Sequence, residues 1–294
     1  MTYLESFTKI LEVIENTQEE KPSIQALADV AFISTSHLQR LFKQLTGQSL
    51  MSYVRGRRLT QSLNELFSSD MRIIDIANEY GFKHEQSYIR AFREEFNCTP
   101  NKARKDKCVL PIRERISPNN LYNMQRGLMY GPEHVIVPDL FMIGKPVIFH
   151  DFDDDRDALL PNMAGQKNIY EVVASVKNPL HPEVYLALAT HIKDRDYEYM
   201  PGTEVESLKH IPSGMKGFHF PMLHCLCFRY VGQHRLEEIN MITAQETYNA
   251  INHFFYNQTR YIRSKNYHLE RIDSLLYDGV FCQMELLIPV KDTF

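Results

Sequence analysis

The sequence contains no tryptophan, and its 5 cysteines are odd in number and include no CxxC pair. This cysteine usage favours reduced thiols over a disulfide framework. No apolar run approaches the ~18 residues that indicate a membrane-spanning helix. The first twenty residues also lack the basic-then-apolar order of a secretory signal. The sequence therefore predicts a cytoplasmic protein with no membrane partner.

The composition is that of a folded globular chain, with 44% hydrophobic and 24% charged residues among 294. At about 100 to 200 residues per domain, the length favours two domains. The net charge of -4 is unevenly distributed, because residues 1–107 hold 15 basic and 14 acidic side chains. No acid occurs between Asp29 and Glu65, although five Lys or Arg residues do. Such a basic region, where it coincides with helices, favours a polyanionic partner.

An internal repeat with an offset of 50 residues relates Leu38–Gly47 to Tyr88–Asn97. Both copies have arginine third, phenylalanine fifth and a basic residue sixth, and they end on the two residue types that most readily adopt the left-handed conformation. Ahead of each copy, residues 24–31 and 73–80 have the i, i+3, i+4, i+7 apolar spacing of a short helix. The sequence therefore predicts two helix-turn-helix units within residues 1–107.

The second helix of each unit is expected to present a polar row opposite its buried stripe. Arginine and amide groups at helical spacing can read purine edges in a DNA major groove. Between the units, a helix over residues 49–68 would act as a spacer that places the two reading helices ~34 Å apart. Arginines on this spacer would contact phosphates. The alternative is a helical bundle that binds protein. The expected DNA contacts from these patterns are Ser36, Gln39, Arg40, Lys43, Gln86, Ile89, Arg90 and Arg93 for bases and Arg55, Arg57 and Arg58, with Lys102 and Arg104, for phosphates.

The motifs His37–Lys43 with Thr46-Gly47, Tyr80–Phe82, and Thr99-Pro100 resemble the double helix-turn-helix domain of AraC-type transcription regulators, in particular the subgroup of Rob, MarA and SoxS. The resemblance implies an all-α DNA-binding domain, double-stranded DNA and RNA polymerase as partners, and base contacts from Ser36, Gln39, Arg40, Glu85, Gln86, Ser87 and Arg90. Close relatives carry Trp in place of Ser36 and Gln in place of Glu85. The target sequence is therefore expected to differ, with Glu85 able to accept from cytosine N4.

Residues 121–294, after a linker at 108–120, mix strands with helices and predict an α+β domain. Strands are expected near 135–149, 184–192, 197–207, 223–231 and 281–288, and helices near 167–175 and 237–256. Short motifs in order, among them Tyr197–Val205, Phe228–Gly232 and Ile288–Val290, resemble a GyrI-like (gyrase-inhibitor-like) effector domain.

That second resemblance implies a groove for a small, hydrophobic and cationic effector. Glu270 matches the acidic position that would balance the cation, with Glu204 as a second candidate. Without tryptophan, the aromatic wall would come from Tyr185, Phe228 and Tyr230. A carboxylate buried among aromatic rings regains its charge when a cation binds. The alternatives are a GyrI-like hydrolase of reactive small molecules with glutamate as base, or a protein-interaction module.

Two segments partly match known metal-binding or catalytic motifs, but neither has the full set of residues that its motif requires. Asp151–Asp155 begins like a calcium loop but lacks the glycine and the final glutamate that the loop requires. His181-Pro182-Glu183 has the H-x-E form of a zinc deaminase, but no P-C-x-x-C follows. No P-loop, GxGxxG or GxSxG is present. The sequence predicts a transcription regulator that is not an enzyme and that holds no metal and no cofactor.

Overall fold

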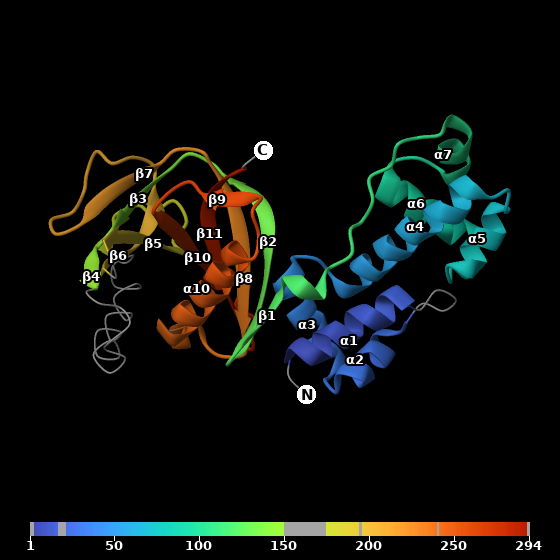
Figure 1. The fold of residues 1–294 in the computed structure, drawn as a ribbon, viewed down its shortest axis with the longest axis horizontal. Helices are drawn as coiled ribbons and strands as arrows, with labels where there is room; N and C mark the ends of the chain where they lie inside the picture. Colours follow the sequence, from blue (N-terminus) through green and yellow to red (C-terminus); the bar gives the residue numbers. More distant parts are fainter. Residues whose placement is uncertain (1–2, 17–21, 150–174, 194–195, 240, 293–294) are drawn as a thin grey trace. The chain divides into compact units, whose positions relative to one another are not determined.

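The computed structural model describes residues 3–16, 22–149, 175–193, 196–239 and 241–292. The chain divides into two compact units, Met1–Asn119 and Asn120–Phe294 (Figure 1). The first contains only helices among its described regular elements, and the second is built on a large antiparallel sheet.

The first unit is a double three-helix arrangement around a long central helix. Its helices are α1 (Tyr3–Asn16), α2 (Ile24–Ala31), α3 (Thr35–Thr46), α4 (Leu50–Ser68), α5 (Ile73–Glu79), α6 (Glu85–Phe96) and α7 (Pro100–Asp106). Helix α1 was not predicted from the sequence, although Phe7, Ile10, Leu11 and Ile14 have helical spacing and are all buried. Phe7 of α1 stacks on Phe42 of α3 with ring centroids 5.5 Å apart, so α1 completes the first core.

The ends of these helices follow from local side-chain chemistry. Ser34, Ser49 and Thr99 cap α3, α4 and α7 by accepting a backbone N–H with their hydroxyl oxygens. Gly47 and Asn97 end α3 and α6 in the left-handed conformation, at φ 71° and 57°. The repeat, its turns and its helix ends are therefore those that the sequence predicted.

The second unit is an antiparallel sheet with one described long helix. Its strands are β1 (Leu121–Met124), β2 (Gly127–Val137), β3 (Leu140–Gly144), β4 (Val147–Phe149), β5 (Val184–Lys193), β6 (Asp196–Val205), β7 (Lys216–Phe220), β8 (Leu223–Gly232), β9 (Tyr261–Arg263), β10 (Tyr267–Asp273) and β11 (Cys282–Asp292). The order is β1-β2-β8-β11-β10-β5-β6-β3-β7, with β4 beside β6 and β9 beside β11. Short 3-10 helices cover Pro118–Asn120, Leu236–Glu238 and Ser274–Leu276.

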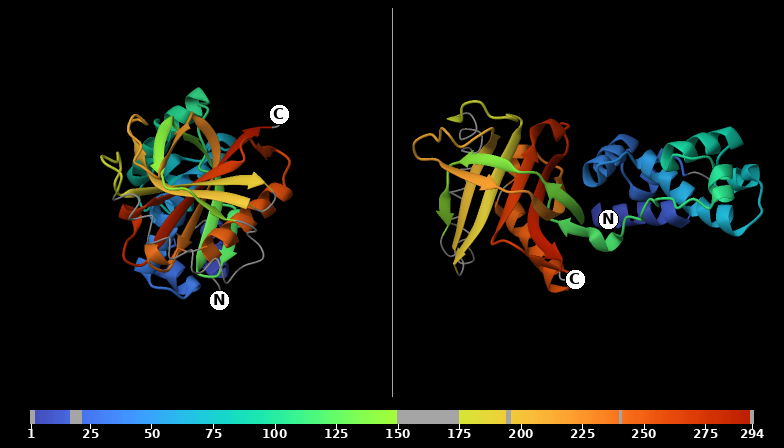
Figure 2. Two further views of the ribbon diagram at one scale, coloured as in Figure 1. Left: turned by 90° about the vertical axis from the view of Figure 1, so that its left-hand side faces the viewer. Right: turned by 90° about the horizontal axis from the view of Figure 1, so that it is seen from above.

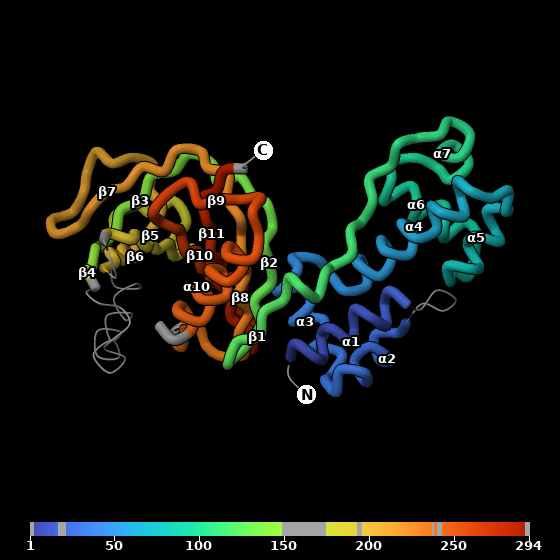
Figure 3. Tube along the Cα trace, viewed as in Figure 1, coloured from blue at the N-terminus to red at the C-terminus, as the bar shows by residue number. Residues whose placement is uncertain are grey.

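Helix α10 (Met241–Tyr256) lies across one face of this sheet (Figures 2 and 3). Ile251 and Phe254 of the helix pack on Phe228 of β8 and Leu286 of β11 within one apolar cluster. The cluster holds the helix against the middle strands. The strand register pairs Phe228 with Leu286, Leu286 with Glu270, Glu270 with Ala187 and Ala187 with Pro201. These residues, and every second residue along their strands, therefore lie on the sheet face that α10 covers.

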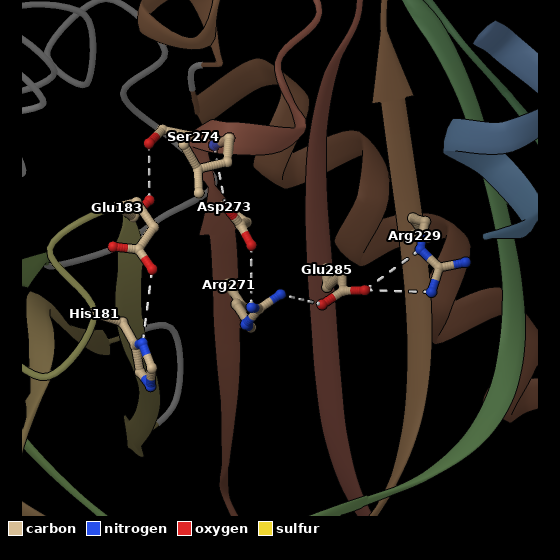
Figure 4. Close-up of polar contacts among 8 residues, drawn as sticks. His181, Glu183, Arg229, Arg271, Asp273, Ser274 and Glu285 are labelled. Carbon is tan, nitrogen blue, oxygen red and sulfur yellow. Dashed lines mark hydrogen bonds and ion pairs between the residues drawn. The ribbon is translucent and has the colours of Figure 1, made fainter.

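The opposite face carries a row of charges across β8, β11 and β10 (Figure 4). Glu285 accepts from the Arg229 guanidinium at 3.2 Å and from that of Arg271 at 3.1 Å, and Arg271 also reaches Asp273 at 3.4 Å. The strand register places Arg229 and Arg271 on either side of Glu285. These charges satisfy one another and stabilise the pairing of the three strands.

Most predicted strands are present, with different boundaries. The strand expected over 135–149 is divided among β2, β3 and β4. The short strands β1, β7, β9 and β10 were not predicted. The predicted helix over 237–256 begins at Met241. The helix expected over 167–175 and the rejected calcium loop at Asp151–Asp155 lie outside the described residues, apart from Ser175.

Candidate nucleic-acid interface and ligand pocket

Helix α3 has one buried side and one polar side. Leu38, Leu41, Phe42 and Leu45 are buried, and Leu41 is the least so at 3% exposed. The four residues predicted to face DNA are exposed: Ser36, Gln39, Arg40 and Lys43. The hydroxyl of Ser36 lies 3.2 Å from that of the capping residue Ser34, at the start of the helix. This helix therefore offers a continuous row of donors with no acid among its members.

Helix α6 repeats the arrangement in the second copy. Its buried side is formed by Tyr88, Phe92 and Phe96, whose rings contact one another in sequence. Gln86, Ser87, Arg90 and Arg93 are exposed, whereas Glu85 and Ile89 are half-buried. Ile89 packs partly against the apolar cluster of the second copy. The polar row of α6 thus matches that of α3, and Ile89 belongs in part to the core.

Glu94 of α6 competes for two of the predicted DNA contacts. Its carboxylate lies 3.1 Å from Arg90 Nε and 3.5 Å from Arg55 Nη1 of α4. All three side chains are well exposed, at 46% for Glu94, 84% for Arg90 and 44% for Arg55. Exposed ion pairs of this kind contribute about 0 to 1 kcal/mol, so both arginines can exchange the carboxylate for a phosphate or a base.

The prediction that Arg57 contacts phosphate is corrected by the structure. Arg57 Nε and Nη2 donate to the Glu15 carboxylate of α1 at 2.8 and 2.7 Å. The two side chains are 12% and 6% exposed. This contact raises the pKa of Arg57 further. Arg57 is therefore half-buried and links α4 to α1, with its charge paired to that of Glu15.

Arg58 is a second arginine of the spacer helix that is not exposed. It is 2% exposed, and burial lowers its pKa. Its guanidinium lies against Gly81, where an added Cβ would come within 2.0 Å of Arg58 Nη2. Gly81 also has φ +66°, so the turn of the second copy needs glycine for both space and conformation. Of the three arginines predicted to contact phosphates from α4, only Arg55 is exposed.

Arg113 connects the two copies within the first unit. Its guanidinium donates to Glu95 of α6 at 2.7 and 2.9 Å and to Gln48, just after α3, at 2.7 Å. It crosses α4 at Gly56, where an added Cβ would lie 2.3 Å from Arg113 Nε. The segment expected as a linker at 108–120 therefore carries, at Arg113, a cross-brace between the ends of the two reading helices.

In the second unit a cavity of about 300 Å³ lies on the α10 face of the sheet. Register places Ala189 of β5 beside His268 of β10 and Tyr199 of β6 on this face, and the small alanine leaves space between larger neighbours. Its aromatic rings come from Tyr197 of β6 and Tyr248 of α10, whereas the ring of Tyr267 packs on Phe218 and Phe220 in the core of the opposite sheet face. The described residues that line the cavity are Ala189, His191, Tyr197, Tyr248, Arg263, Lys265, Asn266, Tyr267, His268 and Ile288.

The three residues predicted to form the aromatic wall of a ligand site do not line this cavity. Phe228 and Tyr230 are 0% and 1% exposed and belong to the core beneath α10. Tyr185 shares the sheet face but does not line the cavity. The tyrosine rings that line the cavity come from β6 and α10. Their assignment required the strand register, which the local sequence does not contain.

Glu270, the predicted counter-charge, is buried at 6% exposed. Its carboxylate accepts from the Tyr199 hydroxyl at 2.9 Å and lies 3.4 Å from His268 Nε2. Burial and this carboxylate raise the pKa of Tyr199 well above its usual value, so Tyr199 stays a donor. Glu204 stands an odd number of residues from Tyr199 on β6 and therefore points to the opposite sheet face. Glu270 is two residues from His268 on the same face of β10, and the two glutamates do not form one site.

The cysteines have no chemistry that suggests catalysis or metal binding. Burial raises the pKa of Cys225, Cys227 and Cys282 to about 12 in each case, which keeps these thiols protonated. All five are free thiols. Among the described residues, no group of His, Cys, Asp or Glu has the arrangement of a metal site, and no helix is long and apolar enough to span a bilayer.

Two exposed reading helices in tandem, each preceded by a tightly turned partner helix, define a DNA-binding protein of the double helix-turn-helix class. Comparison with known proteins agrees. The profile of a family described as "Helix-turn-helix domain" matches residues 27–106. PqrA of Proteus vulgaris, a probable transcription factor, is 40% identical over 89 residues, which are 30% of this chain and 73% of PqrA. MarA of Escherichia coli is 37% identical over 95 residues, which are 32% of this chain and 75% of MarA.

The chain belongs to the AraC-type family of transcription regulators that includes MarA and Rob. Rob of Salmonella typhimurium is 38% identical over 87 residues, 30% of each chain. Among solved structures, SAV2435 bound to tetraphenylphosphonium is similar at a TM-score of 0.40 and 13% identity, covering 55% of this chain and 94% of that one. The predicted order of domains is confirmed, because an all-α helix-turn-helix unit is followed by a domain built on an antiparallel sheet with one described long helix.

Proposed function

We propose that this DNA-binding transcription regulator reads two successive major grooves with α3 and α6 of one chain, and that a small molecule bound in the sheet domain modulates this activity. The observation that supports the first part is the matched pair of exposed rows, with Gln39 and Arg40 on α3 and Gln86 and Arg90 on α6. Bidentate arginine contacts to guanine and amide contacts to adenine are the commonest means of reading DNA sequence.

Three expected groups of DNA contacts differ in role. Arg40 and Arg90, together with the neighbouring amides and hydroxyls, would select bases. Arg55 is exposed on α4 and would neutralise a phosphate, which adds affinity without specificity, whereas Lys43 and Arg93 are exposed members of the two rows and would add contacts to bases. Glu85 at the start of α6 would accept from cytosine N4, so the preferred sequence would differ from those of relatives that carry glutamine there.

The experiment that tests this function is selection of bound duplexes from a random pool with the full chain, followed by competition at moderate salt. We expect Arg40→Ala and Arg90→Ala each to weaken the free energy of binding to the selected duplex by ~1 to 3 kcal/mol. Each variant should also lose base preference at the positions that its helix contacts. Arg55→Ala should weaken selected and random duplexes equally. Lys209→Ala, which removes an exposed charge from the sheet domain, is the control.

Equal losses on selected and random duplexes for Arg40→Ala and Arg90→Ala would contradict the reading role. The modulation by a small molecule rests on the cavity beside α10 and on the resemblance stated for the sheet domain. Cytoplasmic location and recruitment of RNA polymerase follow from the proposed role in transcription. Polymerase binding is tested by co-purification with the DNA-bound chain, and its absence would remove that partner.

A further inference from the structure

The cavity in the sheet domain has a basic lining. Arg263 of β9 and Lys265 of the segment between β9 and β10 contribute two positive charges, His191 and His268 contribute imidazoles, and no carboxylate is among the described residues that line the cavity. Tyr197, Tyr248 and Asn266 add neutral polar groups. A cavity that concentrates positive charge raises the local concentration of anions. The sequence predicted a cationic ligand, but the charged side chains that line this cavity are themselves positive.

The surroundings of Arg263 hold its charge without neutralising it. Its guanidinium carbon lies 4.8 Å from the Phe255 ring centroid and 5.3 Å from that of Tyr248. Nη2 donates to Asn252 Oδ1 at 2.5 Å and Nη1 to the Tyr248 hydroxyl at 3.4 Å. Nε is buried and has no hydrogen-bond partner within the described part of the chain. A partly buried cation with only neutral acceptors is stabilised when an anion joins it.

Lys265 follows two residues later and lines the same cavity. It is exposed, and it forms no ion pair with any residue that the structure describes. Two like charges that share one cavity repel each other, and a single anion between them removes that repulsion. Arginine supplies the planar fork that fits a carboxylate, and lysine supplies a mobile point charge.

The remaining walls fit a flat ring. Tyr248 stacks on His268 with centroids 5.7 Å apart and planes inclined by 26°. Tyr197 stands edge-on to Tyr248 at 6.2 Å, and its hydroxyl donates to that of Tyr248 at 3.1 Å. Ala189 leaves the space in front of these rings. A volume of about 300 Å³ is at the small end of ligand pockets and suits one or two fused rings.

We propose that the effector is a small planar aromatic carboxylate whose ring lies against Tyr248 and Tyr197 and whose anionic group is held by Arg263 and Lys265. This inference rests on the proposed function, because it takes the cavity to be the effector site. The proposed ligand is an anion, whereas the sequence predicted a cation. The carboxylate of Glu270 is buried, accepts from the Tyr199 hydroxyl and lies 3.4 Å from His268 Nε2, and it is not among the described residues that line the cavity.

The test is calorimetric titration of the full chain with three probes: 2-naphthoate, its neutral isostere 2-naphthamide, and tetraphenylphosphonium. We expect 2-naphthoate to bind about tenfold more tightly than the amide, since the charge-assisted hydrogen bonds are lost with the charge. Arg263→Gln and Lys265→Gln should each abolish this preference. Lys209→Gln, which removes an exposed charge elsewhere in the same domain, should retain it. Far-ultraviolet circular dichroism checks folding, and exposed Lys265 provides the readout if Arg263→Gln does not fold.

Each other outcome overturns the inference in a distinguishable way. Equal affinity for 2-naphthoate and 2-naphthamide would show that the pocket binds aromatic rings regardless of charge. That result would overturn the anionic ligand but would leave the proposed effector site in place. Binding of tetraphenylphosphonium without binding of 2-naphthoate would restore the cationic ligand, again with the effector function intact. Absence of binding by all three probes would remove both this inference and the effector half of the proposed function. DNA binding by the same samples reports on the other half.

Discussion

Replacing Arg57 with methionine is expected to destabilise the first unit without changing specific DNA contacts. The substitution replaces the apolar stem of the side chain, removes the guanidinium and leaves the Glu15 carboxylate, which is 6% exposed, without its ion-pair partner. Removing one partner of a buried pair costs about 3 to 5 kcal/mol. Tyr53 and Gln61 still donate to Glu15, at 3.2 and 3.3 Å, so the lower end, about 3 kcal/mol, is expected.

The assay is urea unfolding of the full chain followed by circular dichroism at 222 nm, which reports mainly on the helical unit. With an m-value of about 1 to 3 kcal/mol/M, a loss of 3 kcal/mol lowers the urea midpoint by about 1 to 3 M. Arg55→Met, two residues away on the exposed side of α4, should change the free energy of unfolding by less than about 0.5 kcal/mol. The double variant Glu15→Leu/Arg57→Met should be more stable than Arg57→Met alone.

The reasoning would be refuted by an Arg57→Met chain that unfolds at the wild-type urea concentration and binds every duplex more weakly. That pair of results would return Arg57 to the phosphate-contacting role that the sequence predicted. Loss of stability with retained specific binding by the folded fraction would support the structural link between α4 and α1.

Three further outcomes are expected. Phe32 ends α2 at φ +56° and is 79% exposed, so Phe32→Gly should raise the free energy of unfolding by about 1 kcal/mol in urea titrations; an unchanged or lower value would show that the phenylalanine has a packing role. Glu94→Gln should tighten binding to random duplexes several-fold at low salt, because it removes a carboxylate that competes with phosphate for Arg90 and Arg55; unchanged affinity in a fluorescence anisotropy titration would reject that competition. Burial lowers the pKa of His234, so the unfolded chain takes up the proton first and the sheet domain should lose stability as the pH falls below about 6.5. His234→Gln should flatten this pH dependence between pH 5 and 7, and an equally steep curve would exclude His234 as its source.

The features that the sequence predicted correctly are those with local causes. The apolar spacing of Leu38, Leu41 and Leu45 identifies the buried side of α3, and its complement is the exposed row. Capping residues such as Ser49 and Gly47 act within one helical turn. These signals lie within a few residues of one another, and they repeat at an offset of 50.

The features that the sequence did not predict depend on partners far along the chain. Arg57 looks like any basic residue on an amphipathic helix, and its partner Glu15 lies 42 residues away on an unpredicted helix. In the sheet domain, the side of a strand that faces the cavity depends on register between β10, β5 and β6. Tyr197 and Tyr248 meet across 51 residues, and no local pattern identifies them as a pair.

The most direct test of the central claim is a dimethyl sulfate protection map of guanine N7 on the selected duplex, with the wild-type chain and two variants. We expect the wild type to protect two patches about 10 base pairs apart, one for each reading helix. Arg40→Ala should lose one patch and Arg90→Ala the other. A single protected patch, or the same change in both variants, would contradict the reading of two successive grooves by one chain.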